Sequence, residues 1–172
     1  MPRRRPLWLV AALTALSLGI YLPLWLGLSW LELRQETADE RMQPLWHALS
    51  LFVPGYGYWQ VYQHFRLLGD QLARVGGAGK VDPLSATLGV VLWSITFLHY
   101  STEPLFVLLD AIELSAAIGV VVYGQRALNE YWRTRPGAAV AERLVDTDLL
   151  ALAIAASYFA IAVLGYVSGP GN

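Results

Sequence analysis

The stretch that decides the fold is PLFVLLDAIELSAAIGVVVYG, residues 104–124, an apolar run that contains two acidic residues. Roughly 20 helical residues cross the ~30 Å hydrocarbon core of a bilayer, so this run is long enough to span it. The next segment, QRALNEYWR at residues 125–133, is polar and pairs Gln125 with Asn129 and Arg126 with Glu130 at helical i,i+4 spacing. We therefore expect one long helix that begins in the membrane and continues into the cytoplasm.

Two further apolar runs flank this helix in the sequence. Residues 84–100 (LSATLGVVLWSITFLHY) precede it, and the short segment Ser101-Thr102-Glu103-Pro104 between them predicts a tight helical hairpin. Residues 149–167 (LLALAIAASYFAIAVLGYV) follow it and contain no charged side chain. Both runs are predicted to be transmembrane helices.

The N-terminal part of the chain contributes two more predicted spans. Residues 7–31 lack charged side chains altogether, and the run is too long for the apolar region of a signal peptide, so we expect a retained helix. Residues 43–65 are less apolar and contain Pro54, Gly55 and Gly57 near the middle. They predict a kinked helix or, alternatively, a re-entrant pair of helices.

These runs predict an all-α fold: one transmembrane domain over residues 1–172, a polytopic helical bundle with about five transmembrane helices. Lys and Arg concentrate in cytoplasmic loops, which sets the orientation. With Arg3, Arg4 and Arg5 inside, the loops at 66–83 and 125–148 also lie inside, and Arg34 and Arg41 are left outside. Trp8, Trp30, Trp46 and Trp132 lie at the ends of predicted spans, where aromatic residues favour the lipid interface.

Composition excludes several classes of function. Hydrophobic residues make up 56% of the chain and charged residues 15%, with a net charge of -1, so no basic face for nucleic acid is expected. The absence of Cys removes disulfides and thiolate metal sites. Three His residues at spacings unsuited to a shared ligand predict no metal site, and whether the chain binds a cofactor is left unknown by the sequence. No recognisable catalytic motif is present, so we do not expect an enzyme.

Asp110 and Glu113 are the sharpest candidates for a site. They lie three residues apart on one helix face, and Glu103 lies seven residues before Asp110 on nearly the same line. Acidic residues inside a bilayer cost about 3 kcal/mol each, so they usually face a polar interior or water. His99 on the preceding run is a possible partner. Two interpretations stay open: a proton- or cation-handling site, and a hydrogen-bonded pair that fixes helix register.

Small residues at four-residue spacing predict close helix packing in lipid. They are Ala153 with Ser157, Ala156 with Ala160, and Ser115 with Gly119. Small side chains allow two helix backbones to approach closely where no hydrophobic force drives association. The expected partners are therefore the lipid bilayer and the helix faces of other membrane proteins.

Part of the chain resembles an uncharacterised family of small bacterial multi-pass membrane proteins, a domain of unknown function. The family's hallmark is a Leu-Ser-x(2-3)-Gly-Ile-Tyr-x3-Trp helix, which residues 16–21 and Trp25 match. A second element at residues 42–54 is similar, although Gly-Tyr-Gly-Tyr at 55–58 departs from the hallmark. The resemblance covers residues 7–66 and implies a multi-pass protein of the bacterial inner membrane, with no activity attached.

Two functions follow as hypotheses. The first is a non-catalytic accessory or scaffold subunit of a larger membrane complex, indicated by short loops, small-residue helix faces and the lack of a catalytic constellation. The alternative is a small ion or proton transporter or channel that uses Asp110 and Glu113 within the membrane.

Overall fold

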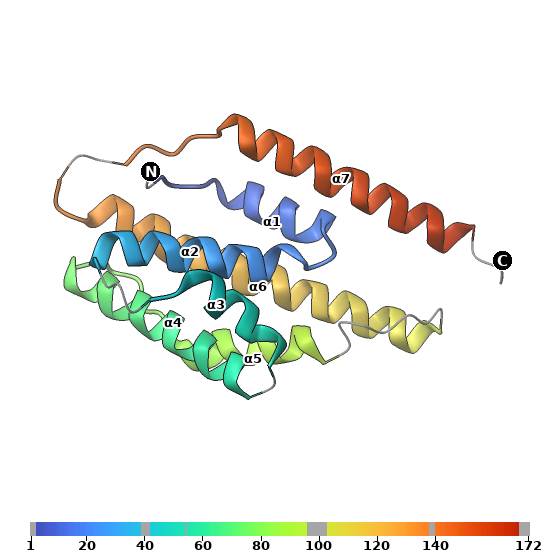
Figure 1. Ribbon diagram of the computed structural model, residues 1–172, viewed down its shortest axis with the longest axis horizontal. Coiled ribbons are helices and arrows are strands. Elements are labelled where there is room, and N and C mark those ends of the chain that lie inside the picture. Colours follow the sequence, from blue (N-terminus) through green and yellow to red (C-terminus); the bar gives the residue numbers. More distant parts are fainter. Residues whose placement is uncertain (1–2, 39–41, 54, 96–102, 138–139, 169–172) are drawn as a thin grey trace.

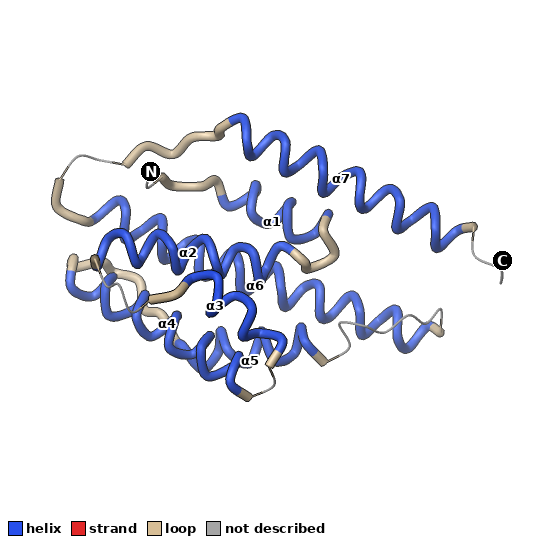
Figure 2. The backbone as a smooth tube through the Cα atoms, viewed as in Figure 1, coloured by secondary structure: helices blue, strands red, loops and turns tan. Residues whose placement is uncertain are grey.

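The computed structural model describes residues 3–38, 42–53, 55–95, 103–137 and 140–168, and these ranges form an all-α fold of seven α-helices and one short 3-10 helix. The elements are α1 (Leu7–Leu16), α2 (Tyr21–Thr37), α3 (Pro44–Leu49), η1 (Ser50–Phe52), α4 (Tyr56–Arg74), α5 (Pro83–Ser94), α6 (Pro104–Thr134) and α7 (Asp146–Val167). The all-α prediction is confirmed. Figure 2 shows helices and connecting loops throughout the described chain.

The helices lie roughly along one axis and alternate in direction along the chain (Figure 1). Helices α1, α3, α5 and α7 run one way, and α2, α4 and α6 return. The N-terminus therefore lies at one end of the bundle and the C-terminus at the other. The long helix α6 contacts α1, α2, α4 and α5, whereas the substantial contacts of α7 are with α1.

The predicted helix over residues 7–31 is wrong, because the chain reverses direction at residues 17–20. Leu18 and Gly19 adopt left-handed backbone angles, with φ of 50° and 89°. A Cβ at Gly19 would lie 2.6 Å from the Trp93 Nε1, so only glycine fits this close approach. Pro23 falls in the first turn of α2, where its missing N–H removes no helical hydrogen bond. Gly19 and Pro23 are therefore the signals for this break.

The predicted span over residues 43–65 is also broken, in the manner of the re-entrant alternative rather than of a kinked helix. Helix α3 and η1 run into the bundle, and α4 returns from Tyr56. The two arms pack closely, since a Cβ on Gly57 would clash with the backbone of Ser50 and Leu51. Pro44 begins α3 at its first turn, a position that favours proline.

The three later helices match their predicted runs more closely. Helix α5 begins at Pro83 and ends at Ser94, before the predicted end at residue 100, and residues 96–102 lie outside the described chain. Helix α6 extends the 104–124 run to Thr134, which confirms the predicted continuation, and α7 covers 149–167. Within the described residues, two helices, α6 and α7, are long and apolar enough to cross a membrane, not five.

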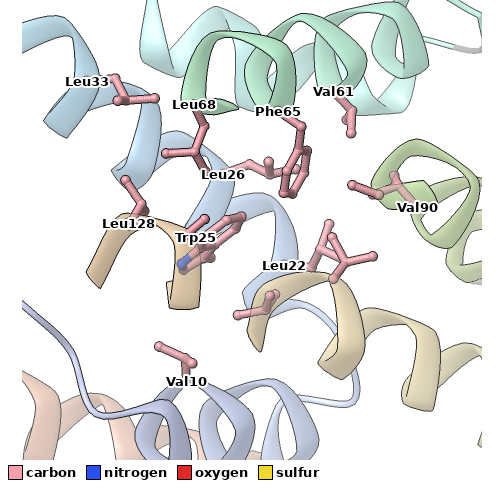
Figure 3. Packing of buried hydrophobic residues seen from close by; sticks show 14 of the residues in the cluster. Val10, Leu22, Trp25, Leu26, Leu33, Val61, Phe65, Leu68, Val90 and Leu128 are labelled. Atoms are coloured by element: carbon pink, nitrogen blue, oxygen red, sulfur yellow. The ribbon is translucent and has the colours of Figure 1, made fainter. Parts of the chain in front are cut away.

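The hydrophobic core lies between α2, α4 and α6, with α1 and α5 on its flanks. Figure 3 shows Trp25 near the centre of this cluster, with Leu128 on α6 and Phe65 and Leu68 on α4 around it. A Cβ on Gly124 would clash with the rings of Trp25 and Phe65, so this glycine is what lets α6 approach the other two helices. Trp30 and Trp132, predicted at the interface, are buried in the bundle, whereas Trp8 and Trp46 are exposed.

Charge is segregated along the bundle axis. We call residues 3–5, 32–38, 66–82 and 125–148 the charged end, because every Lys and Arg that the structure describes lies there. The apolar half comprises residues 7–31, 44–65, 83–95, 104–124 and 149–167, and its described acidic residues are Asp110 and Glu113. The prediction placed Arg34 and Arg41 on the opposite side from the other basic residues. It is wrong for Arg34, because the reversal at residues 17–20 returns α2 to the N-terminal end of the bundle, and Arg41 lies outside the described residues.

Candidate functional site

The predicted acidic pair on α6 is split between two environments. Glu113 is 6% exposed, whereas Asp110 is exposed to the surroundings of the bundle. Asp110 lies on the same helical line as Ala117 and Val121, seven and eleven residues later, and both of these are fully buried. Asp110 thus lies on the line of α6 that is buried further along the helix, yet it is itself exposed. The two acids share a turn of helix without forming a common site.

Glu103 and His99 complete the predicted set. Glu103 is exposed and precedes the first turn of α6, where Pro104 begins the helix. His99 lies outside the described residues. The structure therefore does not test the four-residue set as a whole, and Glu103 and Glu113 each make an interaction with another group.

A buried polar network contains the predicted Gln125–Asn129 pair and, beyond that prediction, joins α2, α6 and the N-terminal segment. The Trp25 indole N–H donates to Gln125 Oε1 at 2.8 Å, and the Gln125 amide donates to Asn129 Oδ1 at 2.9 Å. The Asn129 amide then donates to the Arg5 carbonyl at 2.7 Å and accepts from the Arg5 N–H at 3.1 Å. Gln125 is fully buried, so these bonds replace its hydration. The i,i+4 spacing of Gln125 and Asn129 was the available signal.

Arginines at the N-terminus are held by the fold. Arg5, 6% exposed, pairs with Glu32 on α2, and Arg3 pairs with Asp148 on α7. The hydrogen bond to Asp148 raises the pKa of Arg3. Arg4 donates from Nε to the Val140 carbonyl at 2.8 Å. These residues fasten the N-terminal segment between α2 and the α6–α7 linker, so they are not a free basic cluster.

Ser29 and His64 form a contact that superficially suggests a catalytic dyad. The Ser29 Oγ lies 3.1 Å from the His64 Nε2, and neither side chain is exposed. The Ser29 hydroxyl donates its single proton to the Leu26 carbonyl at 2.9 Å, so the His64 Nε2 must be the donor to Ser29. A base-activated serine needs the opposite polarity. The pair is therefore arranged as a packing contact.

The His64 ring also packs on Trp30, and the His47 ring stacks on Trp30 as well. The ring centroids of Trp30 and His47 are 4.3 Å apart, and those of Trp30 and His64 are 4.8 Å apart. A cavity of about 150 Å³ opens beside this stack, between α3 and the start of α4. It is lined by Gln43, Trp46, His47, Tyr56 and Gln60. The cavity holds no acidic or basic residue apart from the exposed His47, so it offers aromatic and amide surface.

Metal binding has no support in the part of the chain that the structure describes. No group of three or more His, Asp or Glu side chains there is placed to hold an ion. The exposed surface is instead the main chemical feature of the apolar half. Helix α7 exposes apolar side chains on nearly every side, among them Leu150, Ile154, Ile161 and Leu164, each more than 60% exposed.

Comparison with known proteins adds no family: no family model matches the chain, and neither a curated protein nor a solved structure matches it.

Proposed function

We propose that the chain is a non-catalytic accessory subunit of a larger complex in the bacterial inner membrane. The exposed apolar surface of α7 carries this proposal. Two α7 residues are buried: Asp148, which pairs with Arg3, and Ala155, which packs on Leu9 and Leu13 of α1. The other described side chains of α7 are exposed or only partly covered. Monomeric soluble proteins rarely expose an apolar surface of this extent. The bacterial location follows from the resemblance of residues 7–66.

Small residues on α7 indicate a protein partner as well as lipid. Ala153, Ala156, Ser157 and Ala160 are all exposed, so the small-residue pairs predicted from the sequence lie on a surface that no other part of the described chain covers. In lipid, helices associate through such close backbone contacts. Two observations support a non-catalytic role. The Ser29–His64 hydrogen bond does not have the direction that a base-activated serine needs, and Asp110 and Glu113 lie in different environments.

Native mass measurement in mild detergent tests the accessory role. Protein purified from its own membranes should migrate as a stoichiometric complex, and replacing Ala156 and Ala160 by Leu should release the monomer. Ile161→Leu on the same helix is the matched control, because it keeps the exposed apolar character at a position without a small side chain. A free monomer for the unaltered chain, in every mild detergent tried, counts decisively against this role.

The alternative function, a proton or cation carrier that uses Asp110 and Glu113, has one observation in its favour: Glu113 is buried within an apolar helix. Buried acids in membrane helices often mark ion pathways. Asp110→Asn together with Glu113→Gln, in vesicles that hold a pH-sensitive dye, tests it. An unchanged flux of protons and alkali cations removes the alternative.

A further inference from the structure

We propose that the two hairpins α1–α2 and α3–α4 enter the membrane from the cytoplasmic side and turn back near its midplane. Residues 7–31 and 44–65 then contact the cytoplasmic leaflet of the bilayer alone, and residues 32–38 lie in the cytoplasm. This inference rests on the membrane location proposed above and is independent of the accessory role.

Helix α6 provides the depth scale. Its apolar run, residues 104–124, covers about 30 Å at 1.5 Å per residue, which equals the thickness of the hydrocarbon core. Arg126 is exposed just past this run, and the opposite end begins at Pro104. Gly124 therefore lies near the cytoplasmic edge of the hydrocarbon, and residues 114–116 lie near its middle.

The α1–α2 turn lies at the depth of these middle residues. Helices α5 and α6 run antiparallel, and a Cβ on Gly89 would contact Val120. One turn further along α5, Trp93 is therefore level with about residue 116 of α6. Gly19 packs against the Trp93 indole. The turn thus lies about 12 Å below the level of Gly124, or nearly half of the hydrocarbon thickness.

The α3–α4 turn reaches a similar depth. Phe65 on α4 stacks on Tyr123 of α6 with ring centroids 6.1 Å apart, which places Phe65 near the cytoplasmic edge. Tyr56 lies nine residues earlier on the same helix, about 13 Å deeper. The Tyr58 hydroxyl also lies 2.7 Å from the Ser94 hydroxyl, next to Trp93 on α5. Two hairpins of different sequence therefore end at one level.

The tips of both hairpins have the chemistry of hydrocarbon-facing surface. Leu18 and Ile20 at the first tip are 39% and 40% exposed, and Val53 at the second is 52% exposed. No Asp, Glu, Lys, Arg or His occurs at residues 7–31 or 48–63. A hairpin that crossed the whole membrane would carry its tip into headgroups and water, where these exposed apolar residues would be unfavourable.

The backbone N–H groups of the first turn are also satisfied within the chain. The N–H groups of Ser17, Leu18, Gly19 and Ile20 donate to carbonyls at distances of 2.8 to 3.1 Å. The Tyr21 N–H donates to the Ser17 Oγ at 2.9 Å. A turn at the protein surface in water does not need an internal hydrogen bond for every backbone N–H group, because water can accept from it. In hydrocarbon, each unpaired backbone group costs several kcal/mol. The turn is therefore built for a medium without water.

The distribution of charge fixes the leaflet. Five full spans would place Arg34 outside, whereas the re-entrant arrangement returns it to the side of Arg3, Arg74 and Lys80. Basic residues favour the cytoplasmic side, so the re-entrant arrangement satisfies this preference for every described Lys and Arg. Asp110 lies on the far side of the hairpin tips, within the outer leaflet, which explains why the described bundle leaves it exposed.

Single cysteines in this naturally Cys-free chain test the inference. We would place one each at Gln35, Ala78, Ser168 and Ile20, all exposed positions, and label them with a membrane-impermeant maleimide in vesicles of each orientation. Ala78 reports the cytoplasmic side and Ser168 the outer side. The cysteine at position 35 should be labelled from the same side of the membrane as the cysteine at position 78. Five full spans would instead require labelling from the same side as the cysteine at position 168.

Ile20→Cys carrying a fluorophore gives the depth. Its quenching by phospholipids with a spin label near the chain end should exceed that by headgroup-labelled phospholipids at least several-fold. Reaction of Gln35 on the outer side, or reaction of the unlabelled Ile20→Cys variant with the maleimide from outside, overturns the inference. If all four positions react from both sides and the protein leaves the membrane in alkaline carbonate, the membrane location itself fails. A re-entrant result with a monomer by mass leaves the topology standing and rejects the accessory role.

Discussion

The charged end and the apolar half are built from the same helices but are held together by different forces. At the charged end, Arg5, Glu32, Gln125 and Asn129 are linked by ion pairs and hydrogen bonds, and the apolar core lies behind them. In the apolar half, the helices share a buried hydrophobic core, but outward-facing residues such as Leu24, Leu88 and Leu108 are more than half exposed. This is the difference expected from the proposed location, with water around one end and lipid around the other.

The largest expected effect comes from breaking the buried ion pair of the charged end. Arg5→Leu leaves the Glu32 carboxylate without its cation in a largely buried position, which typically costs 3–5 kcal/mol of unfolding free energy. Reversible unfolding in detergent, followed by circular dichroism, measures the loss. The double variant Arg5→Leu with Glu32→Leu should regain most of it. Equal stability of the single and double variants contradicts the role of the pair.

A charged residue placed on the surface of the apolar half tests whether lipid surrounds that half. Ile161 is 70% exposed near the middle of the 149–167 run, and Ile161→Arg should cost about 3 kcal/mol of membrane insertion. The fraction of chain that resists carbonate extraction after translation with membrane vesicles measures this cost. Gln35→Arg at the exposed charged end is the control and should insert like the parent. If both variants insert equally, the apolar half does not face lipid.

Packing between the two regions is tested at the glycines of α6. Gly124→Leu drives a side chain into the Trp25 and Phe65 rings and should cost about 1–3 kcal/mol or more, as overpacked cores do. Gly119→Leu lies on the same helix with open space around its Cβ, and it should leave the midpoint of thermal unfolding nearly unchanged. The midpoints of thermal unfolding of the two variants are measured in the same detergent and compared. Because leucine favours a helix more than glycine does, similar losses at both positions would show that the Trp25 and Phe65 rings do not set the cost at Gly124.

The smallest effect concerns the capping residue at the start of α5. Asp82 accepts hydrogen bonds from the Ser85 hydroxyl and from the Leu84 and Ser85 N–H groups, and the Ser85 hydroxyl bond is the main reason that its pKa is lowered. A lowered folded-state pKa means that this carboxylate stabilises the fold above its unfolded pKa of about 3.9. The stabilisation disappears as pH falls through the folded value.

Unfolding followed between pH 2 and 6 should therefore show a small acid-side loss that Ser85→Ala reduces and Asp82→Ala abolishes. Thr87→Ala, one turn into α5, is the control, because the Thr87 hydroxyl donates to the Pro83 carbonyl and does not contact Asp82. An identical pH profile in all four proteins rejects the cap.

The amino-acid sequence by itself determined the helical class of this protein and the position of several helices. The apolar runs predicted an all-α chain, the 104–133 segment predicted one continuous helix, and 149–167 predicted another. Pro54 and Gly55 marked a place where residues 43–65 could turn back. These features are local: they depend on helix propensity, on the length of apolar runs and on the restricted backbones of proline and glycine.

What only the tertiary structure decided is where the chain turns and which polar groups meet. The stretch 7–31 has the composition of a single span, yet Gly19 makes close contact with Trp93, a residue 74 positions later, and the hairpin forms there. Likewise, Asp110 and Glu113 share a helix face in the sequence, but Glu113 is buried and Asp110 is exposed, a difference that depends on the segments packed around each residue. Close approach and burial are set by distant segments, so one-dimensional periodicity carries no record of them.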